Sequence, residues 1–227
     1  MIVSINQPAY LPYLGYFNRI AKSDLHVVLD HVQFEKNSFT NRNKIKTKDG
    51  SLMLTIPIKT KGQFGNLAIN SIEIADEIWK IKHIKSLEST YTKAPYYKLY
   101  KDIISEFYNN DFKLFIDIVK PINDWLFNQL NIKTPLIYSS NLNLSSTKSD
   151  LILEICKATN ASQYLSGPFG RSYLEIEKFS QNGIDVIFDD YVHPVYKQFN
   201  GNFDPYMCVF DLLFNIGPES DKFFINT

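Results

Sequence analysis

The sequence lacks several features that mark well-known classes of protein. Lys plus Arg and Asp plus Glu are equal, at 24 residues each, so the broad positive field of a nucleic-acid-binding protein is absent and nucleic acid is not expected as the primary partner. No run of about 18 apolar residues occurs, and residues 1–6 show no secretory signal. We therefore expect a cytoplasmic protein without a membrane partner.

Cysteine is also scarce. Cys156 and Cys208 each lie within an apolar helical pattern, which favours two buried thiols in a reducing compartment over a disulfide or a metal site. The His, Cys and carboxylate residues have no zinc spacing, and neither a Walker loop nor a Gly-x-Ser-x-Gly elbow occurs. The sequence therefore requires no metal and no cofactor.

Arginine is rare among the cationic residues, since only Arg19, Arg42 and Arg171 interrupt the lysines. A planar guanidinium binds a carboxylate or a phosphate through two parallel hydrogen bonds, which the lysine ammonium cannot do. The place of each arginine in the fold is therefore informative about anion binding.

Apolar residues, in contrast, are plentiful enough to fill one core. The 227 residues are 44% hydrophobic and 15% aromatic, which fits a single domain over residues 1–227. Apolar runs and alternation predict strands at residues 2–5, 25–29, 52–58, 136–138, 163–165 and 184–188. Helical spacing predicts helices at residues 14–21, 76–91, 97–108, 111–130, 149–159, 173–182 and 206–214.

This alternation predicts an α/β fold with a mostly parallel, Rossmann-like sheet of about six strands flanked by helices. Residues 35–50 are expected to form a loop or a short turn of helix. The helical stretch at residues 76–131 is either an inserted subdomain or a layer over one sheet face. Pro121 is expected to interrupt or kink the helix that contains it.

Three polar segments follow predicted strands, which is the edge where open parallel sheets bind ligands. They are a proline-rich loop at residues 7–17, a group formed by Asp30, His31, Gln33 and residues 41–44, and a glycine turn at residues 166–171. We expect Arg42 to face the same cleft as Gln7 and Gly167. Ordinary surface turns are the competing interpretation, because Pro, Gly, Asn and Lys are common in loops.

His83 is the leading histidine, because Trp79, His83 and Leu87 recur every four residues and share one helix face. That position fits either a general base beside a cleft or a core histidine whose hydrogen bonds are satisfied. His193 is the second candidate.

Motifs spread over nearly the whole chain carry a family resemblance. They are Gln7-Pro8 with Tyr10, residues 12–17, Asp30, Val32-Gln33-Phe34, Asn41-Arg42-Asn43, residues 55–57, Trp79 with Lys82-His83, Tyr91 with Lys93-Ala94-Pro95, Tyr164-Leu165-Ser166-Gly167 with Tyr173, Gln198, and residues 211–215. Together they resemble the WbqC-like proteins of bacterial O-antigen and related gene clusters. The family's opening motif often begins with His where this chain has Asn6, which argues against residue 6 as an essential base.

The resemblance implies a role in lipopolysaccharide or other surface-polysaccharide biosynthesis, with transfer of glycine or another acyl group to an aminosugar. We therefore expect an acyl or aminoacyl transferase that acts on an amino group of a nucleotide-linked sugar. Its partners would be that sugar nucleotide and an activated or carrier-bound acyl donor. The sequence does not identify the donor, the sugar or the oligomeric state.

Such a reaction needs an anion pocket for pyrophosphate, a base for the attacking amine and donors for the oxyanion. His83 or Asp30 is the expected base, and Asn41 is an expected oxyanion donor together with Gln7 and Asn43. Phosphate is expected at Arg42, Lys44 and the glycine turn, and a base or sugar ring on the tyrosines of the first loop. The further expected substrate-binding residues are Tyr10, Tyr13, Gly15, Tyr16, Gln33, Ser166, Gly167, Gly170, Arg171, Tyr173 and Gln198.

Two alternatives stay open. The first strand, the proline-rich loop and Gly15 at a helix start also resemble nucleotidylyltransferase and class I synthetase domains, which implies ATP-dependent activation of a carboxylate. Those proteins normally carry a pair of histidines in this loop, and this chain has none there. The other alternative is a non-catalytic protein that binds a sugar nucleotide within a biosynthetic complex.

Overall fold

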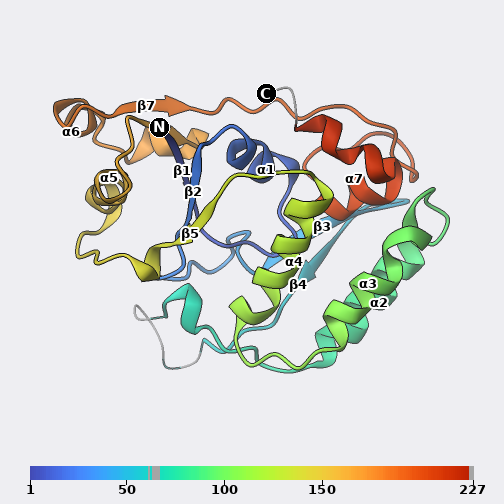
Figure 1. The fold of residues 1–227 in the computed structure, drawn as a ribbon. Coiled ribbons are helices and arrows are strands. Elements are labelled where there is room, and N and C mark those ends of the chain that lie inside the picture. Colours follow the sequence, from blue (N-terminus) through green and yellow to red (C-terminus); the bar gives the residue numbers. More distant parts are fainter. Residues whose placement is uncertain (61, 63–66, 225–227) are drawn as a thin grey trace.

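The computed structural model describes residues 1–60, 62 and 67–224, and its centre is a five-stranded parallel sheet (Figure 1). The strands are β1 (Ile2–Asn6), β2 (Leu25–Val28), β5 (Leu136–Tyr138), β6 (Gln163–Ser166) and β7 (Asp185–Phe188), in the order β5-β2-β1-β6-β7. Every neighbouring pair in this sheet is parallel. The predicted α/β fold with a mostly parallel sheet is confirmed.

The direction of strand addition reverses at β1. The chain passes from β1 through β2 to β5 on one side, and it then returns to β6 and β7 on the other side of β1. Open parallel sheets bind ligands outside the carboxyl ends of the strands at such a switch point. The fold therefore favours a site at the ends of β1 and β6.

Helices cover both faces of this sheet (Figure 1). One face packs against α5 (Lys148–Ala158) and α6 (Ile176–Gln181), and the other against α1 (Leu14–Ala21) and α4 (Phe115–Gln129). Side chains alternate along β1, so Val3 and Ile5 enter the core formed with α5 and α6. Ser4 points to the opposite face, where its hydroxyl lies 2.8 Å from Nδ1 of the buried His26.

A separate antiparallel hairpin is formed by β3 (Arg42–Thr47) and β4 (Gly50–Thr55). Two predictions are wrong here, since residues 42–47 form a strand and not a loop, and the strand predicted at 52–58 pairs in the hairpin and not in the parallel sheet. Apolar periodicity could not reveal β3, because it is mostly polar. Its buried Asn43 and Lys46 are tolerated because each side chain has a partner, the Leu11 carbonyl for Asn43 Nδ2 and the Asp204 carboxylate, 3.9 Å away, for Lys46 Nζ.

The remaining helices, α2 (Ile78–Tyr91), α3 (Tyr97–Asn109) and α7 (Val209–Ile216), pack with the hairpin, α1 and α4 around one hydrophobic core. Each predicted helix is present, at residues 14–21 with the predicted ends and elsewhere with one or both ends shifted, and α4 continues through Pro121 without interruption. Short 3-10 helices lie at Ile69–Ser71, Ser139–Asn141, Pro168–Ser172 and Gly217–Phe223.

The two cysteines and the helix lengths can be compared with the sequence analysis. Cys156 and Cys208 are buried, free thiols, which matches the prediction. Over the described ranges, no helix combines the length and the apolar character that crossing a membrane requires.

Candidate functional site

The carboxyl ends of β1 and β6 bring Asn6 and Gly167 to the same edge of the sheet. Ser4 pairs with Leu165 in the parallel register, so Asn6 and Gly167 each lie two residues beyond this pair, in the direction of the carboxyl ends. Both positions face α1, because residues of equal parity share a sheet face. Asn6 Nδ2 is buried and has no hydrogen-bond partner among the described residues.

Arg19 of α1 fills the space beside Gly167. A Cβ atom at position 167 would lie 2.5 Å from Arg19 Nη1, so the missing side chain of glycine leaves room for the guanidinium. Arg19 is half-buried, and its Nε has no hydrogen-bond partner in the described part of the chain. The guanidinium hydrogen-bonds the Tyr13 side chain. A planar cation is thus held at the switch point of the sheet.

No carboxylate among the described residues forms an ion pair with Arg19. Asp189, the buried carboxylate that follows β7, lies 3.1 Å from Lys22 Nζ instead. The imidazole of His26 is neutral, because burial and then the charge of Arg19 lower its pKa to about 3. The half-exposed Tyr173 is also within the electrostatic reach of Arg19. Arg19 therefore creates a positive potential that its surroundings do not neutralise.

Arg171, in contrast, already holds a carboxylate. Its Nη1 and Nη2 each donate to one oxygen of Asp190 at 2.9 Å, and its guanidinium lies 4.4 Å from the centre of the Phe188 ring. This exposed pair holds the pKa of Asp190 below its ordinary value. A Cβ at Gly170 would lie 2.1 Å from Ser166 Oγ, so this glycine lets the turn fold onto the end of β6. The turn lies at the predicted edge, but its arginine is occupied.

Arg42 lines a different cavity. Its Nε donates to the Ser38 carbonyl at 3.1 Å and its Nη2 donates to the Asn37 carbonyl. The cavity, of about 270 Å³, is lined by Phe34, Lys36, Asn37, Asn41, Arg42, Thr55, Ile56, Pro57, Ile58 and Thr60. Gln7 reaches the same region, since its Oε1 accepts a hydrogen bond of 3.3 Å from Thr40 Oγ1. Among the described residues, the lining of this cavity contains neither Gln7 nor Gly167, so the structure does not bring Arg42 and Gly167 into one cleft.

The asparagines of this region bind backbone groups. Asn41 Nδ2 donates to the Ile56 carbonyl at 2.8 Å, and Asn43 Nδ2 donates to the Leu11 carbonyl at 2.6 Å. Asn43 Oδ1 accepts the Lys44 amide at 2.8 Å. One amide N–H of each side chain is thus used to hold the hairpin segment against the backbone of Ile56 or Leu11.

Asp30, at the end of β2, is buried among donors. Its carboxylate accepts hydrogen bonds from Ser139 Oγ at 3.0 Å, the Ser140 amide at 2.9 Å and Ser140 Oγ at 2.7 Å. Gln33 is exposed, and its Oε1 accepts the Leu67 amide at 2.8 Å. Asp30 thus links β2 to the segment after β5, and a substrate proton would have to displace one of these donors.

His83 lies between the core and a second cavity. Its Nδ1 is 2.9 Å from the hydroxyl of the fully buried Tyr10, which also contacts the Tyr108 hydroxyl, and the Thr55 backbone forms another hydrogen bond with the ring. Burial lowers the pKa of His83 to about 4, so the imidazole is neutral at pH 7. The cavity, of about 420 Å³, is lined by Leu52, Met53, Leu54, Thr55, Pro57, Asp76, Trp79, Lys82, His83 and Ser86. Protein groups satisfy the ring, as expected for a core histidine.

An aromatic cluster connects the switch point to His193. The Tyr13 ring lies 6.1 Å from the Tyr191 ring and 6.0 Å from the Tyr206 ring, and these two lie 5.9 and 5.1 Å from the His193 ring. His193 Nδ1 donates to the Pro194 carbonyl at 2.9 Å, so Nε2 carries the lone pair. That Nε2 is buried without a partner among the described residues, and burial lowers the pKa of the ring.

Gly15 and Tyr16 shape this region from inside. A Cβ at Gly15 would lie 2.4 Å from the Tyr13 ring and 2.7 Å from the Tyr191 ring, so glycine allows both rings to approach α1. Tyr16 is buried, with its ring 6.1 Å from that of His26. Tyr13 thus contacts both Arg19 and the aromatic cluster around His193.

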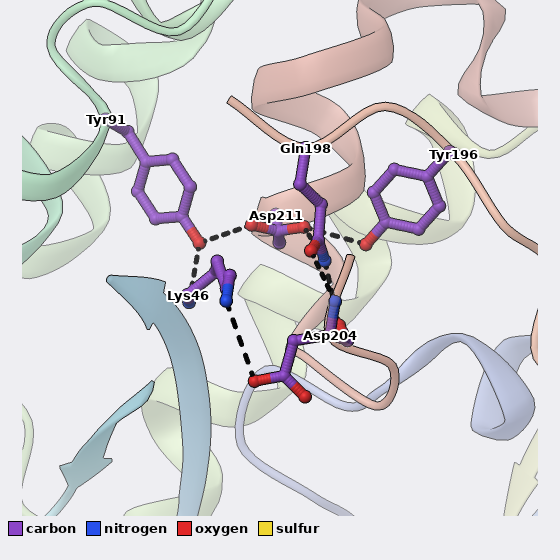
Figure 2. A network of polar contacts seen from close by, with 6 residues as sticks. All are labelled: Lys46, Tyr91, Tyr196, Gln198, Asp204 and Asp211. Carbon is purple, nitrogen blue, oxygen red and sulfur yellow. Dashed lines mark hydrogen bonds and ion pairs between the residues drawn. The ribbon is translucent and has the colours of Figure 1, made fainter. Parts of the chain in front are cut away.

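Gln198 belongs to a buried network around Asp211, at the start of α7 (Figure 2). The members are Lys46, Tyr91, Tyr196, Gln198, Asp204 and Asp211. Asp211 accepts hydrogen bonds from Tyr91, Tyr196 and Gln198 Nε2 at 2.7, 2.8 and 2.9 Å. Burial raises its pKa, which these donors partly offset. Gln198 therefore orients an internal carboxylate and its neighbours in this conformation.

Arg19 and Asp211 are two charged residues that the sequence analysis does not assign to the site. Arg19 lies inside a helical pattern and not after a strand, although its rarity among the cations is a signal in the sequence. Asp211 lies in the motif at residues 211–215, but that motif does not reveal its partners, because Tyr91 comes from a distant segment and Tyr196 from the loop before α7. Over the described residues, no three His, Cys, Asp or Glu side chains are grouped to hold a metal ion.

Comparison with known proteins agrees with the motifs. A model of the WbqC-like protein family matches residues 7–223. An uncharacterized protein of Mycobacterium tuberculosis is 31% identical over 223 residues, which is 97% of this chain and 96% of that relative. No solved structure matches the chain. The predicted family resemblance is confirmed.

Proposed function

Because this chain belongs to the WbqC-like protein family, we propose that it transfers an acyl or aminoacyl group, of the glycine type, to an amino group of a nucleotide-linked sugar in O-antigen or other surface-polysaccharide biosynthesis. The observation that carries this proposal is the strand order, which places Asn6, Arg19 and Gly167 at the switch point of a parallel sheet. Phosphate-bearing small molecules are the usual ligands at that place in such sheets.

The reaction is a nucleophilic acyl transfer. The amine nitrogen of the sugar attacks the acyl carbonyl carbon, a C–N bond forms, and the bond from that carbon to the leaving group of an activated ester or thioester breaks. The amine loses a proton, which the base accepts and passes to the leaving group. No oxidant or metal enters this balance.

We assign the base to His193. Its Nε2 lone pair has no partner among the described residues, and burial keeps the ring neutral by lowering its pKa. The rings of Tyr191 and Tyr206 connect it to Tyr13, which hydrogen-bonds Arg19. The two bases favoured by the sequence are less suitable, because Tyr10 and Thr55 satisfy His83, and the two serines after β5 satisfy Asp30.

The test is to incubate the protein with dTDP- and UDP-linked aminosugars and a set of acyl and aminoacyl thioesters, and to look for the product mass by mass spectrometry. His193→Gln should lower turnover by about 100- to 10,000-fold while the affinity for the sugar nucleotide is kept. His31→Gln, which removes a half-buried imidazole on another strand end, should retain turnover.

Three outcomes would contradict the proposal. Binding of a sugar nucleotide without any product would indicate a non-catalytic binding protein. Release of pyrophosphate that depends on ATP and a carboxylic acid would indicate carboxylate activation. Full turnover by His193→Gln would remove His193 from the reaction and leave acyl transfer without its proposed base.

A further inference from the structure

We infer that Arg19, held against Gly167, binds the diphosphate of the nucleotide-linked sugar at the ends of β1 and β6. This inference rests on the proposed function for the identity of the ligand, and it adds the binding residue and the chemical group bound. It replaces Arg42 and Arg171, the arginines that follow predicted strands, as the anion-binding residue.

The three arginines of the chain differ in what their guanidinium groups already bind. Arg171 forms two parallel hydrogen bonds with Asp190, so its bidentate face is taken. Arg42 donates to two backbone carbonyls of its own loop. Arg19 has a hydrogen bond with Tyr13 and no carboxylate partner among the described residues. Arg19 is therefore the arginine with capacity for an incoming anion.

The groups around Arg19 leave its guanidinium free to bind an anion. Gly167 leaves the space that the guanidinium occupies, since any Cβ there would lie 2.5 Å from Nη1. The neighbouring Asp189 is engaged by Lys22 at 3.1 Å and so does not neutralise Arg19. The imidazole of His26 is buried and neutral. A half-buried cation among neutral groups attracts an anion more strongly than a solvated one, because the local dielectric is lower.

A second donor is available at the same edge of the sheet. Asn6 is the last residue of β1, and its buried Nδ2 has no partner in the described part of the chain. A diphosphate offers several acceptor oxygens, so it can accept from the guanidinium and from this amide at the same time. The two donors come from consecutive elements, since β1 supplies Asn6 and the helix that follows it, α1, supplies Arg19.

Isothermal titration calorimetry with inorganic pyrophosphate, UDP and uridine tests the inference on the full chain. Pyrophosphate and UDP should bind the wild type more tightly than uridine does. Arg19→Gln should weaken both phosphate ligands by about 10- to 100-fold, which is the usual effect of losing a charge-assisted hydrogen bond. Arg19→Lys should recover only part of this loss, because the charge returns without the bidentate geometry.

Gly167→Ala tests whether the position of the Arg19 guanidinium matters when its charge is unchanged. It keeps the guanidinium but pushes it from its place, so phosphate affinity should fall although the net charge is unchanged. Lys178→Gln removes one exposed positive charge from α6, where Lys178 pairs with Asp150 of α5, and it should leave the affinity unchanged. A thermal melt of each variant verifies that the folded fraction is the same.

The result that overturns the inference is equal pyrophosphate affinity in the wild type and Arg19→Gln, or no pyrophosphate binding by the wild type. A loss on Arg171→Gln in place of Arg19→Gln would assign the anion to the glycine turn. Failure of the proposed function looks different. In that case pyrophosphate would bind in an Arg19-dependent manner, but no sugar nucleotide would be acylated with any donor.

Discussion

The Tyr91 hydroxyl donates a hydrogen bond of 2.7 Å to Asp211 Oδ1, although the two residues lie 120 positions apart. The same hydroxyl accepts the Lys46 amide of β3 at 3.0 Å (Figure 2). The second carboxylate oxygen accepts from Tyr196 and Gln198. One buried carboxylate thus joins α2, β3, α7 and the segment before α7.

Asp211→Asn should lower the free energy of unfolding by about 1–3 kcal/mol. The amide NH₂ would replace one carboxylate oxygen and would face a group that donates a hydrogen bond to that oxygen in the wild type. Gln198 cannot reverse its amide to compensate, since its Nε2 and Oε1 both bind the backbone of Asp204. Urea unfolding measures the change. Asp204→Asn is the matched control, because its contact with Lys46 is 3.9 Å and partly exposed, and it should cost less than about 1 kcal/mol. Equal costs would mean that the network does not stabilise the fold.

The pH dependence of that network has a definite sign. Burial raises the pKa of Asp211 in the folded protein above its ordinary value of 3.8, so between these two values the folded state binds more protons than the unfolded state. The stability contributed by Asp211 is therefore present at acidic pH and is lost as the pH rises through the folded-state pKa. The difference in unfolding free energy between wild type and Asp211→Asn should shrink with rising pH. A difference that grew with pH would show that the carboxyl has a lowered pKa.

His83 should act on stability in the opposite direction. Its pKa falls from 6.5 to about 4 on folding, so the unfolded state binds the proton more tightly in that interval. Stability should drop as the pH falls from 6.5 towards 4, by an amount on the order of 3 kcal/mol for the complete interval. His83→Gln should flatten this part of the urea stability profile, and its turnover per folded molecule should stay near that of the wild type. A large loss of turnover in folded His83→Gln would restore His83 as the base.

Two glycines with positive φ, Gly183 and Gly217, allow the stability cost of backbone strain to be compared with the cost of a steric clash. Gly217 ends α7 with φ at 70°, and a Cβ there would lie 2.4 Å from the Tyr96 ring, whereas Gly183 has φ at 71° and would meet nothing within 4 Å. Gly183→Ala should cost about 1–2 kcal/mol from the left-handed conformation. Gly217→Ala should cost about 1–3 kcal/mol more, because the ring must move. Thermal unfolding compares the two, and equal losses would exclude the contact with Tyr96 as a constraint.

Some positions of the candidate site could be predicted from local patterns, and others could not. Gln7 and Gly167 were predicted because each follows an apolar strand, and the parallel sheet does place those strand ends side by side. Arg42 was predicted to join them, but β3 is a polar strand whose pairing with β4 has no apolar signature. Arg19 was missed because a helical position gives no indication of which strand end its long side chain will reach.

The sequence by itself determined the parallel sheet, the helices and the family, because apolar periodicity and short motifs are local properties that a single chain displays in order. Tertiary structure alone decided which polar groups are satisfied. Asp211 finds its donors on segments far away in sequence, Arg171 finds Asp190, and Arg19 finds the empty space at Gly167. The reason is physical: the state of a buried charge depends on the partners and the dielectric around it, and these exist only after the strands and helices have packed.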